Sequence, residues 1–149
     1  MEKCLSLAKQ SGGQLIMLDQ FTARQADIIL GLGRVEETLN LAEQAIGIAR
    51  QMGGIWAEGH ARRTLGRALA ALTPPRWDEA EAQMAQSVQL MESGQNLMGD
   101  AHTEIAWGEV GRDRWNLDDA RDHWGKAAAF FESKGLTKRV EQVRALIAI

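Results

Sequence analysis

The stretch Glu43-Gln-Ala-Ile-Gly-Ile-Ala-Arg-Gln-Met-Gly-Gly54 decides the fold, because similar stretches return about every forty residues. Glu2-Lys-Cys-Leu-Ser-Leu-Ala-Lys-Gln-Ser-Gly-Gly13 has the same pattern, and the segments from Gln86 to Gly94 and from Lys126 to Gly135 follow it. Each copy is amphipathic, carries small residues on one face and ends at glycine. A fixed period of this length is typical of stacked helical repeats rather than of a globule with one central core.

Helical periodicity dominates the rest of the chain, and no stretch alternates as a half-buried strand does. Glycine and proline divide the helical segments at regular intervals. The predicted helices are residues 2–11, 14–31, 35–52, 55–72, 76–93, 97–114, 117–133 and 137–148. Because the connections between them are short, neighbouring helices are expected to be antiparallel. The sequence therefore predicts an all-α fold.

Composition excludes several classes of function. Hydrophobic residues make up 45% and charged residues 25% of the 149 residues, which is typical of a folded protein. The net charge of -3 gives no general attraction to nucleic acid or to acidic membranes. A single cysteine, Cys4, excludes an internal disulfide and a multi-cysteine metal site. Since no signal-peptide or membrane-spanning run is found either, we expect a cytoplasmic protein.

The spacing of small residues resembles the tetratricopeptide repeat (TPR) family. Trp107-Gly108, Ala120 and Ala127 reproduce the family's Leu-Gly, Ala and Ala spacing. The second pair offers Leu65-Gly66, Ala80 and Ser87, and the first offers Ala26, Gly33, Thr38 and Ala45. Small residues at these positions let helices approach closely, and large residues fill the space beside them. The resemblance covers nearly the whole chain and implies a right-handed superhelix of antiparallel helix pairs.

The longer period also resembles the C-terminal helical repeats of bacterial signalling ATPases, nucleotide cyclases and MalT-like transcriptional activators. Under this resemblance the chain is one domain, which divides into a half-repeat at 1–13, repeats at about 14–54, 55–95 and 96–135, and a cap at 136–149. In the cap, Val140, Val143 and Ile147 are expected to be buried, while Lys138, Arg139 and Arg144 face water.

In the TPR family the first helix of each pair lines a concave groove. Carrying these positions over gives Gln20, Ala23, Asp27 and Leu30 in the first pair; His60, Arg63, Arg67 and Ala70 in the second; and His102, Ile105, Glu109 and Arg112 in the third. The resemblance therefore implies a groove whose middle is basic.

Two interpretations remain open for the polar residues of this groove. Arg63 and Arg67 are suited to clamp a ligand carboxylate, since guanidinium groups match carboxylate geometry. They are equally explained, together with Arg62, as a solvated face paired with glutamates. His60 and His102 share one position in adjacent repeats, but two histidines without a third ligand make a poor metal site. We therefore expect ordinary polar histidines, no metal and no cofactor.

The aromatic residues offer further contact candidates. Trp115 and Trp124 are the tryptophans expected to be exposed, either for partner contact or for local packing. Trp107 is expected in the core, Trp56 and Trp77 are expected between repeats, and His123 is expected at the surface.

No catalytic motif appears in the chain, so we expect no enzyme activity. The leading hypothesis is a protein- or peptide-binding module, for which Arg63→Ala with Arg67→Ala should weaken an acidic ligand about tenfold. One alternative is self-association through the apolar face of the first helix, which carries Leu5 and Ala8. Another is sensing of a small ligand in the groove.

Overall fold

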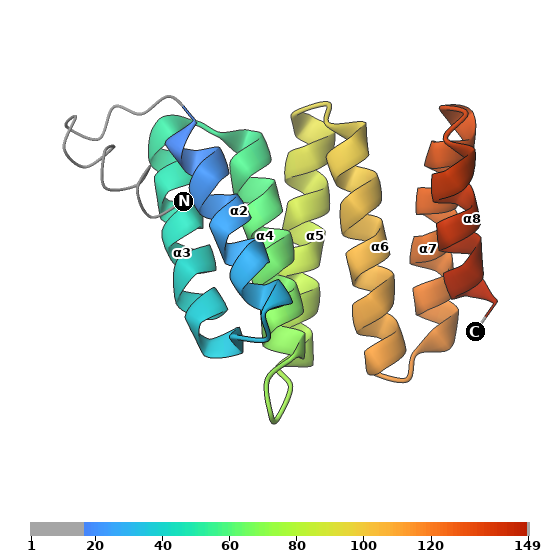
Figure 1. Ribbon diagram of the computed structural model, residues 1–149, viewed down its shortest axis with the longest axis horizontal. Coiled ribbons are helices and arrows are strands. Elements are labelled where there is room, and N and C mark those ends of the chain that lie inside the picture. Colours follow the sequence, from blue (N-terminus) through green and yellow to red (C-terminus); the bar gives the residue numbers. More distant parts are fainter. Residues whose placement is uncertain (1–16, 149) are drawn as a thin grey trace.

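The computed structural model describes residues 17–148, which form helices joined by short turns (Figure 1). These helices are α2 (Leu18–Gly31), α3 (Val35–Met52), α4 (Ile55–Ala70), α5 (Trp77–Ser93), α6 (Leu97–Asp113), α7 (Leu117–Ser133) and α8 (Thr137–Ile147). No strand is found among the described residues, so the all-α prediction is confirmed. The predicted helix at 2–11 lies outside the described residues. The helix predicted from residue 14 begins at Leu18, after Met17 in a left-handed conformation.

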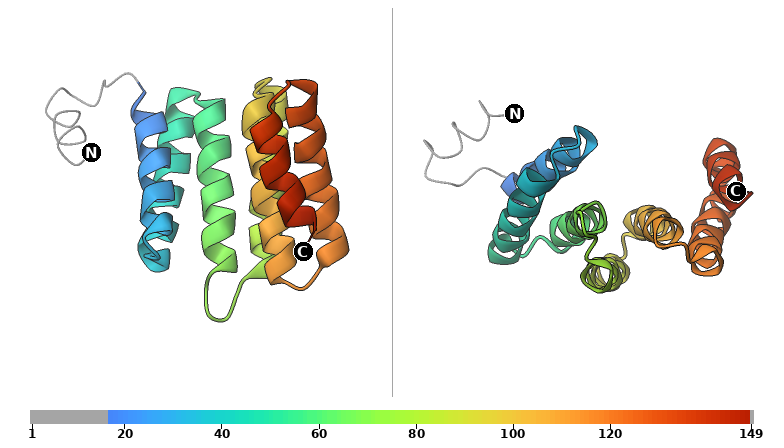
Figure 2. Two further views of the ribbon diagram at one scale, coloured as in Figure 1. Left: turned by 45° about the vertical axis from the view of Figure 1, so that its right-hand side comes forward. Right: turned by 90° about the horizontal axis from the view of Figure 1, so that it is seen from below.

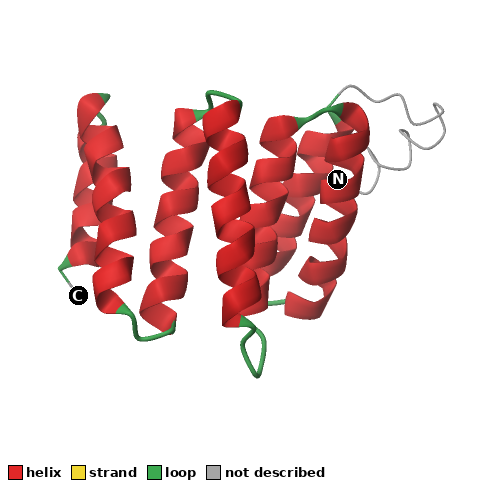
Figure 3. Cartoon of the chain, turned by 180° about the vertical axis from the view of Figure 1, so that it is seen from behind, coloured by secondary structure: helices red, strands yellow, loops and turns green. Residues whose placement is uncertain are grey.

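Most turns share one backbone geometry. A residue with positive φ follows the helix, and the next N–H donates to a carbonyl five residues earlier, as from Gly54 to Ala49 at 2.8 Å. The positive-φ residues of these turns are Gly33, Gly53, Gln95, Trp115 and Gly135. Glycine reaches this conformation without steric cost, which explains the predicted helix ends. The connection from α4 to α5 is a longer loop that contains Pro74 and Pro75 (Figure 3).

The helices stand side by side in a curved row (Figure 2). Each contacts the next along the chain, and α4 also contacts both α2 and α6. Seen end-on in Figure 2, α2, α4 and α6 lie on one side of the row, while α3, α5 and α7 lie on the other. The first helices of the three pairs thus share one face, which is the arrangement required for a groove.

Alanine makes the close contacts between the first two helix pairs. Ala42, Ala45 and Ala49 of α3 and Ala57, Ala61 and Ala68 of α4 are fully buried. Such short side chains let neighbouring helix backbones approach closely at native packing density. Ile46, Leu65, Leu69 and Met84 fill the remaining space in this cluster.

The contact between α6 and α7 corrects two predictions. Trp124 is 1% exposed, so the predicted exposure was wrong. Its ring lies over Gly108 of α6, and its Nε1 donates to the Ile105 carbonyl at 3.2 Å. His123 is also buried, against Glu104 and stacked on Trp107 with 4.3 Å between ring centroids. The helical spacing of Ala120, Trp124, Ala127 and Phe131 is the sequence signal that marks this buried face.

Trp115 has the opposite environment and is 89% exposed, as predicted. It occupies the positive-φ position of the turn between α6 and α7, where the turns at Gly33, Gly53 and Gly135 use glycine and the turn between α5 and α6 uses Gln95. A bulky residue is rare in this conformation.

The last described helix, α8, packs against α7. Val140 and Val143 are buried against α7, and Ile147 packs at the edge of the same cluster. Lys138, Arg139 and Arg144 are exposed, and Arg144 pairs with Glu132 at 3.1 Å. None of the described helices is both long and apolar enough to cross a membrane.

Candidate functional site

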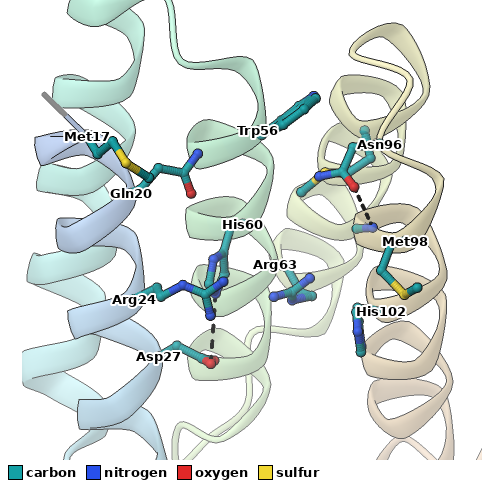
Figure 4. A pocket seen from close by; sticks show the side chains of 12 residues that line it. Met17, Gln20, Arg24, Asp27, Trp56, His60, Arg63, Asn96, Met98 and His102 are labelled. Carbon is teal, nitrogen blue, oxygen red and sulfur yellow. Dashed lines mark hydrogen bonds and ion pairs between the residues drawn. The ribbon is translucent and has the colours of Figure 1, made fainter. Parts of the chain in front are cut away.

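A cavity of about 580 Å3 opens on the face shared by α2, α4 and α6 (Figure 4). Its walls come from Met17 and α2 on one side, α4 in the middle, and α6 with one residue of α5 on the other. The lining residues are Met17, Gln20, Arg24, Asp27, Trp56, His60, Arg63, Met91, Asn96, Met98, Gly99 and His102. Gln20, His60 and His102, one from each of α2, α4 and α6, meet in this cavity.

Two further hollows extend this cavity toward the other end of the same helices. The smaller shares Asp27, Arg63 and His102 with the cavity. The larger, of about 390 Å3, is lined by Leu30, Arg67, Ala70, Ala71, Ala106, Glu109, Val110, Arg112 and Asp113. Together they form one groove, which we define by these three sets of residues.

All eight polar residues expected in the groove lie on it. Gln20, Asp27, His60, Arg63 and His102 line the large cavity, and Arg67, Glu109 and Arg112 line the hollow beyond it. Leu30, Ala70 and Ile105 also lie on this surface. Ala23 does not, because it is fully buried between helices.

Charged residues at one level of the groove form a ladder across the three helices. Arg67 Nη1 donates to Asp27 Oδ1 at 3.2 Å, and Arg67 Nε lies 4.0 Å from Glu109 Oε2. The neighbouring His60, together with the positive charges of Arg63 and Arg67, lowers the pKa of Asp27 to about 2. Asp27 is therefore ionised at neutral pH, and Arg67 is engaged by two carboxylates.

His60 lies deeper in the wall. Its Nε2 is 3.8 Å from Asp27 Oδ2, which is too long for a hydrogen bond, and this atom has no hydrogen-bond partner among residues 17–148. Burial lowers the pKa of His60, and the charge of Arg63 adds to the effect. Burial also lowers the pKa of His102, again with a contribution from Arg63. Burial thus favours the neutral form of both imidazoles.

The three arginines of α4 have different environments. Arg62 donates to Glu58 at 2.9 Å and to Gln83 at 2.8 Å, so the expected pairing with glutamate holds for this residue. It is buried, however, and does not belong to a solvated face. Arg67 belongs to the ladder. Arg63 has no carboxylate within 4.0 Å among the described residues, and neither does Arg24 on α2. Burial lowers the pKa of Arg63 to about 10, which leaves it protonated at neutral pH.

Apolar and amide groups surround the mouth of the cavity. In Figure 4, Met17, Gln20, Trp56, Asn96 and Met98 lie toward one end, while Arg24, Arg63 and His102 lie farther along the helices. Met17, Trp56 and Met98 are each exposed. The Trp56 Nε1 donates to the Gly94 carbonyl at 2.8 Å, which holds its ring at the mouth.

Sequence reasoning missed several of these residues. Arg24 lies one turn after Gln20 and before Asp27, so helical spacing alone places it on the groove face. Trp56 was expected between repeats but is half exposed at the cavity. Asn96 and Met98 come from the start of α6, where no pattern distinguishes a lining residue from a cap. Asn96 performs both roles, since its side chain also accepts a hydrogen bond from the Gly99 N–H at 3.0 Å.

The Asp27 carboxylate should stabilise the fold in a pH-dependent way. Its pKa falls from 3.8 to about 2 on folding, so its contribution is present above about pH 4 and is lost as the pH falls toward 2. The side chain is 37% exposed, so we discount the shift for screening and expect Asp27→Asn to cost about 1 kcal/mol at pH 7. Urea unfolding at stepwise lower pH should show this difference vanish. Asp118→Asn, at a fully exposed carboxylate, is the control.

Within residues 17–148, no group of three or more His, Cys, Asp or Glu side chains is arranged to hold a metal ion. His60, His102 and Asp27 all line the cavity but are not arranged as such a group.

No protein-family model matches this chain, and neither a curated protein nor a solved structure shows a significant match to it.

Proposed function

We propose that this chain is a TPR-type helical-repeat module that binds an acidic peptide segment of another protein in the groove, without catalysis. The observation that carries the proposal is the pair of guanidinium groups on Arg24 and Arg63. Both line the large cavity, and neither has a carboxylate partner within 4.0 Å among the described residues. The resemblance of the repeats to those of bacterial signalling proteins supports a place for the module within a regulatory protein.

Charge and solvation explain why these two residues would supply affinity. A charge-assisted bond from arginine to carboxylate is stronger than a neutral hydrogen bond, and it is bidentate in good geometry. Arg63 is already partly desolvated by the groove wall, so a ligand carboxylate there is weakly screened. Arg67 contributes less, because Asp27 and Glu109 already neutralise it. Because Arg67 is already paired, joint substitution of Arg24 and Arg63 tests ligand binding better than joint substitution of Arg63 and Arg67.

The remaining walls indicate what lies next to the acidic group. Trp56, Met17 and Met98 offer aromatic and thioether surface, which suits an apolar side chain of the ligand. Gln20 and Asn96 offer amide groups that match a peptide backbone. The preferred ligand is thus a peptide with an acidic residue close to an apolar one, bound on a largely preformed surface.

Binding of synthetic peptides tests the proposal. A panel of peptides with Asp or Glu beside an apolar residue is titrated by calorimetry, and Asn or Gln versions are measured beside them. Arg24→Ala with Arg63→Ala should weaken binding of the acidic peptides about tenfold or more. Arg121→Ala with Arg144→Ala is the matched control, because it removes the same charge from exposed sites on α7 and α8.

Equal loss in both double variants would indicate a general charge effect and would count against the groove. Binding of the amide peptides at full strength would remove the role assigned to the arginines. The volume of the large cavity also suits a small organic acid. If a free N-acetylated acidic amino acid binds as tightly as the peptides, small-ligand sensing replaces peptide recognition as the function.

A further inference from the structure

The large cavity has two levels along α2, α4 and α6. On α4, Trp56 precedes His60 by four residues, which corresponds to a rise of about 6 Å along the helix axis. Met98 precedes His102 by the same spacing on α6. Trp56 and Met98 are apolar and exposed, and Met17 joins them from the start of α2. We call these three residues the apolar level; beyond it, the cavity wall carries imidazole and guanidinium groups (Figure 4).

Two guanidinium groups from different helices meet beyond the apolar level. In Figure 4, Arg24 lies beside His60, and Arg63 lies between His60 and His102. Burial lowers the pKa of Arg63 to about 10, and the positive charge of Arg24 adds to the effect. These two cations repel each other, and neither has a carboxylate within 4.0 Å among residues 17–148. A ligand that brings two negative charges is therefore favoured between them.

The ladder sets the far limit for an anion in the groove. Asp27 and Glu109 each present a carboxylate there, and Arg67 is engaged by both. A further anion at the ladder would be repelled by two carboxylates and would find Arg67 already paired. The favourable position for negative charge therefore lies between the apolar level and the ladder, at Arg24 and Arg63.

We propose that the ligand of the groove presents a phosphorylated aromatic side chain, as phosphotyrosine does, with its ring at the apolar level and its phosphate at Arg24 and Arg63. Such a side chain would be the acidic residue of the peptide in the proposed function, on which this inference rests. A phosphate monoester carries close to two negative charges at neutral pH and offers three acceptor oxygens. A carboxylate carries one charge and two oxygens, so it matches one guanidinium rather than two.

The length of the side chain also distinguishes the two acidic groups. Gln20 and Asn96, whose amides suit a peptide backbone, lie toward the mouth of the cavity (Figure 4). Arg24 and Arg63 lie farther along the helices. An aspartate side chain keeps its carboxylate close to the backbone. A phosphotyrosine side chain holds its phosphate a full ring farther away, in the same order, apolar and then charged, that the cavity has.

Each part of a phosphotyrosine side chain has a matching surface in the cavity. The indole of Trp56 offers an aromatic contact to the ring, and the thioethers of Met17 and Met98 pack well against aromatic edges. The planar guanidinium groups of Arg24 and Arg63 match phosphate oxygens in bidentate geometry. The cavity of about 580 Å3 has room for both the ring and the phosphate.

Four versions of one synthetic peptide, titrated into the full chain, test the proposal. They share apolar residues on both sides of a central phosphotyrosine, tyrosine, phosphoserine or glutamate. Calorimetry at about pH 7.5 keeps the phosphate dianionic, because its second pKa is about 6. The phosphotyrosine peptide should bind at least about tenfold more tightly than each of the other three, since it alone fills both the apolar level and the space between the arginines.

Variants separate the contribution of the ring from that of the phosphate. Trp56→Ala should weaken binding of the phosphotyrosine peptide about fivefold and leave the phosphoserine peptide unchanged, because only the first has a ring. Unchanged phosphoserine binding also shows that the variant is folded. Arg24→Ala with Arg63→Ala should weaken both phosphorylated peptides about tenfold or more. Trp115→Ala, at an exposed tryptophan outside the groove, is the control and should change neither.

Equal affinity for the glutamate and phosphotyrosine peptides would overturn the inference and leave the proposed acidic-peptide function in place. Equal affinity for the phosphoserine and phosphotyrosine peptides would also overturn it, because the ring would then contribute nothing. If none of the three charged peptides binds, the proposed function itself fails. If phenyl phosphate alone binds as tightly as the phosphotyrosine peptide, the aromatic phosphate is confirmed as the ligand group and small-ligand sensing replaces peptide recognition.

Discussion

Replacing Gly108 with alanine should lower the free energy of unfolding by about 3 kcal/mol, because the new methyl group has no space. An ideal Cβ on Gly108 would lie 2.3 Å from Trp124 Nε1 and 2.5 Å from Cδ1. The indole cannot move aside easily, since it is 1% exposed and its Nε1 donates to the Ile105 carbonyl. Alanine gains up to about 1 kcal/mol over glycine from helix propensity, which is too little to offset the clash.

Gly125→Ala is the matched control in the partner helix. A Cβ on Gly125 would meet no atom within 4 Å. Only the higher helix propensity of alanine then acts, and it should stabilise the protein by up to about 1 kcal/mol. Urea unfolding followed by circular dichroism measures both variants. If Gly108→Ala proves as stable as the parent chain, the close contact between α6 and Trp124 is not present in solution.

His123→Ala should cost about 3 kcal/mol of stability, because it removes the ring between the buried Glu104 and the half-buried Trp107. Glu104 would lose its closest partner and retain Lys126 at 3.7 Å. Trp107 would lose the stacked ring at 4.3 Å between centroids. A buried carboxylate without a hydrogen-bonding partner is far costlier than an absent one.

A double-mutant cycle tests whether the pair is coupled. Glu104→Gln removes the charge that His123 satisfies, so the double variant should cost clearly less than the sum of the two single changes. Thermal or urea unfolding of the four proteins gives the coupling free energy. Strict additivity would show that His123 contributes only its volume to the contact between α6 and α7.

Helix positions were predictable because each depends on local sequence. Periodic apolar residues specify the helices, and Gly53 or Gly135 specifies an end through its own backbone freedom. The groove residues were expected on other grounds, because the resemblance to the TPR family implies which positions of each first helix face the groove. Asp27 and Arg67 are two of these positions, and both line the same hollow.

Contacts between helices were not predictable in the same way. Trp124 is buried because Gly108, on another helix, leaves room for its ring. The different environments of Arg62, Arg63 and Arg67 likewise depend on which carboxylates neighbouring helices bring near. The sequence pattern of one helix does not specify its distance to side chains on another helix. The tertiary arrangement therefore overruled the expected exposure of Trp124 and the common environment expected for the arginines.

Tryptophan placement makes the molecule its own optical reporter. Trp124 lies in the dry interior, so its fluorescence should report on folding. Trp115 is almost wholly in water and should be the first to be quenched by iodide. Trp56 stands at the mouth of the groove, fixed through its hydrogen bond to Gly94, where an arriving ligand would alter its emission. Folding, solvent access and occupancy of the groove can thus be followed in one unlabelled chain.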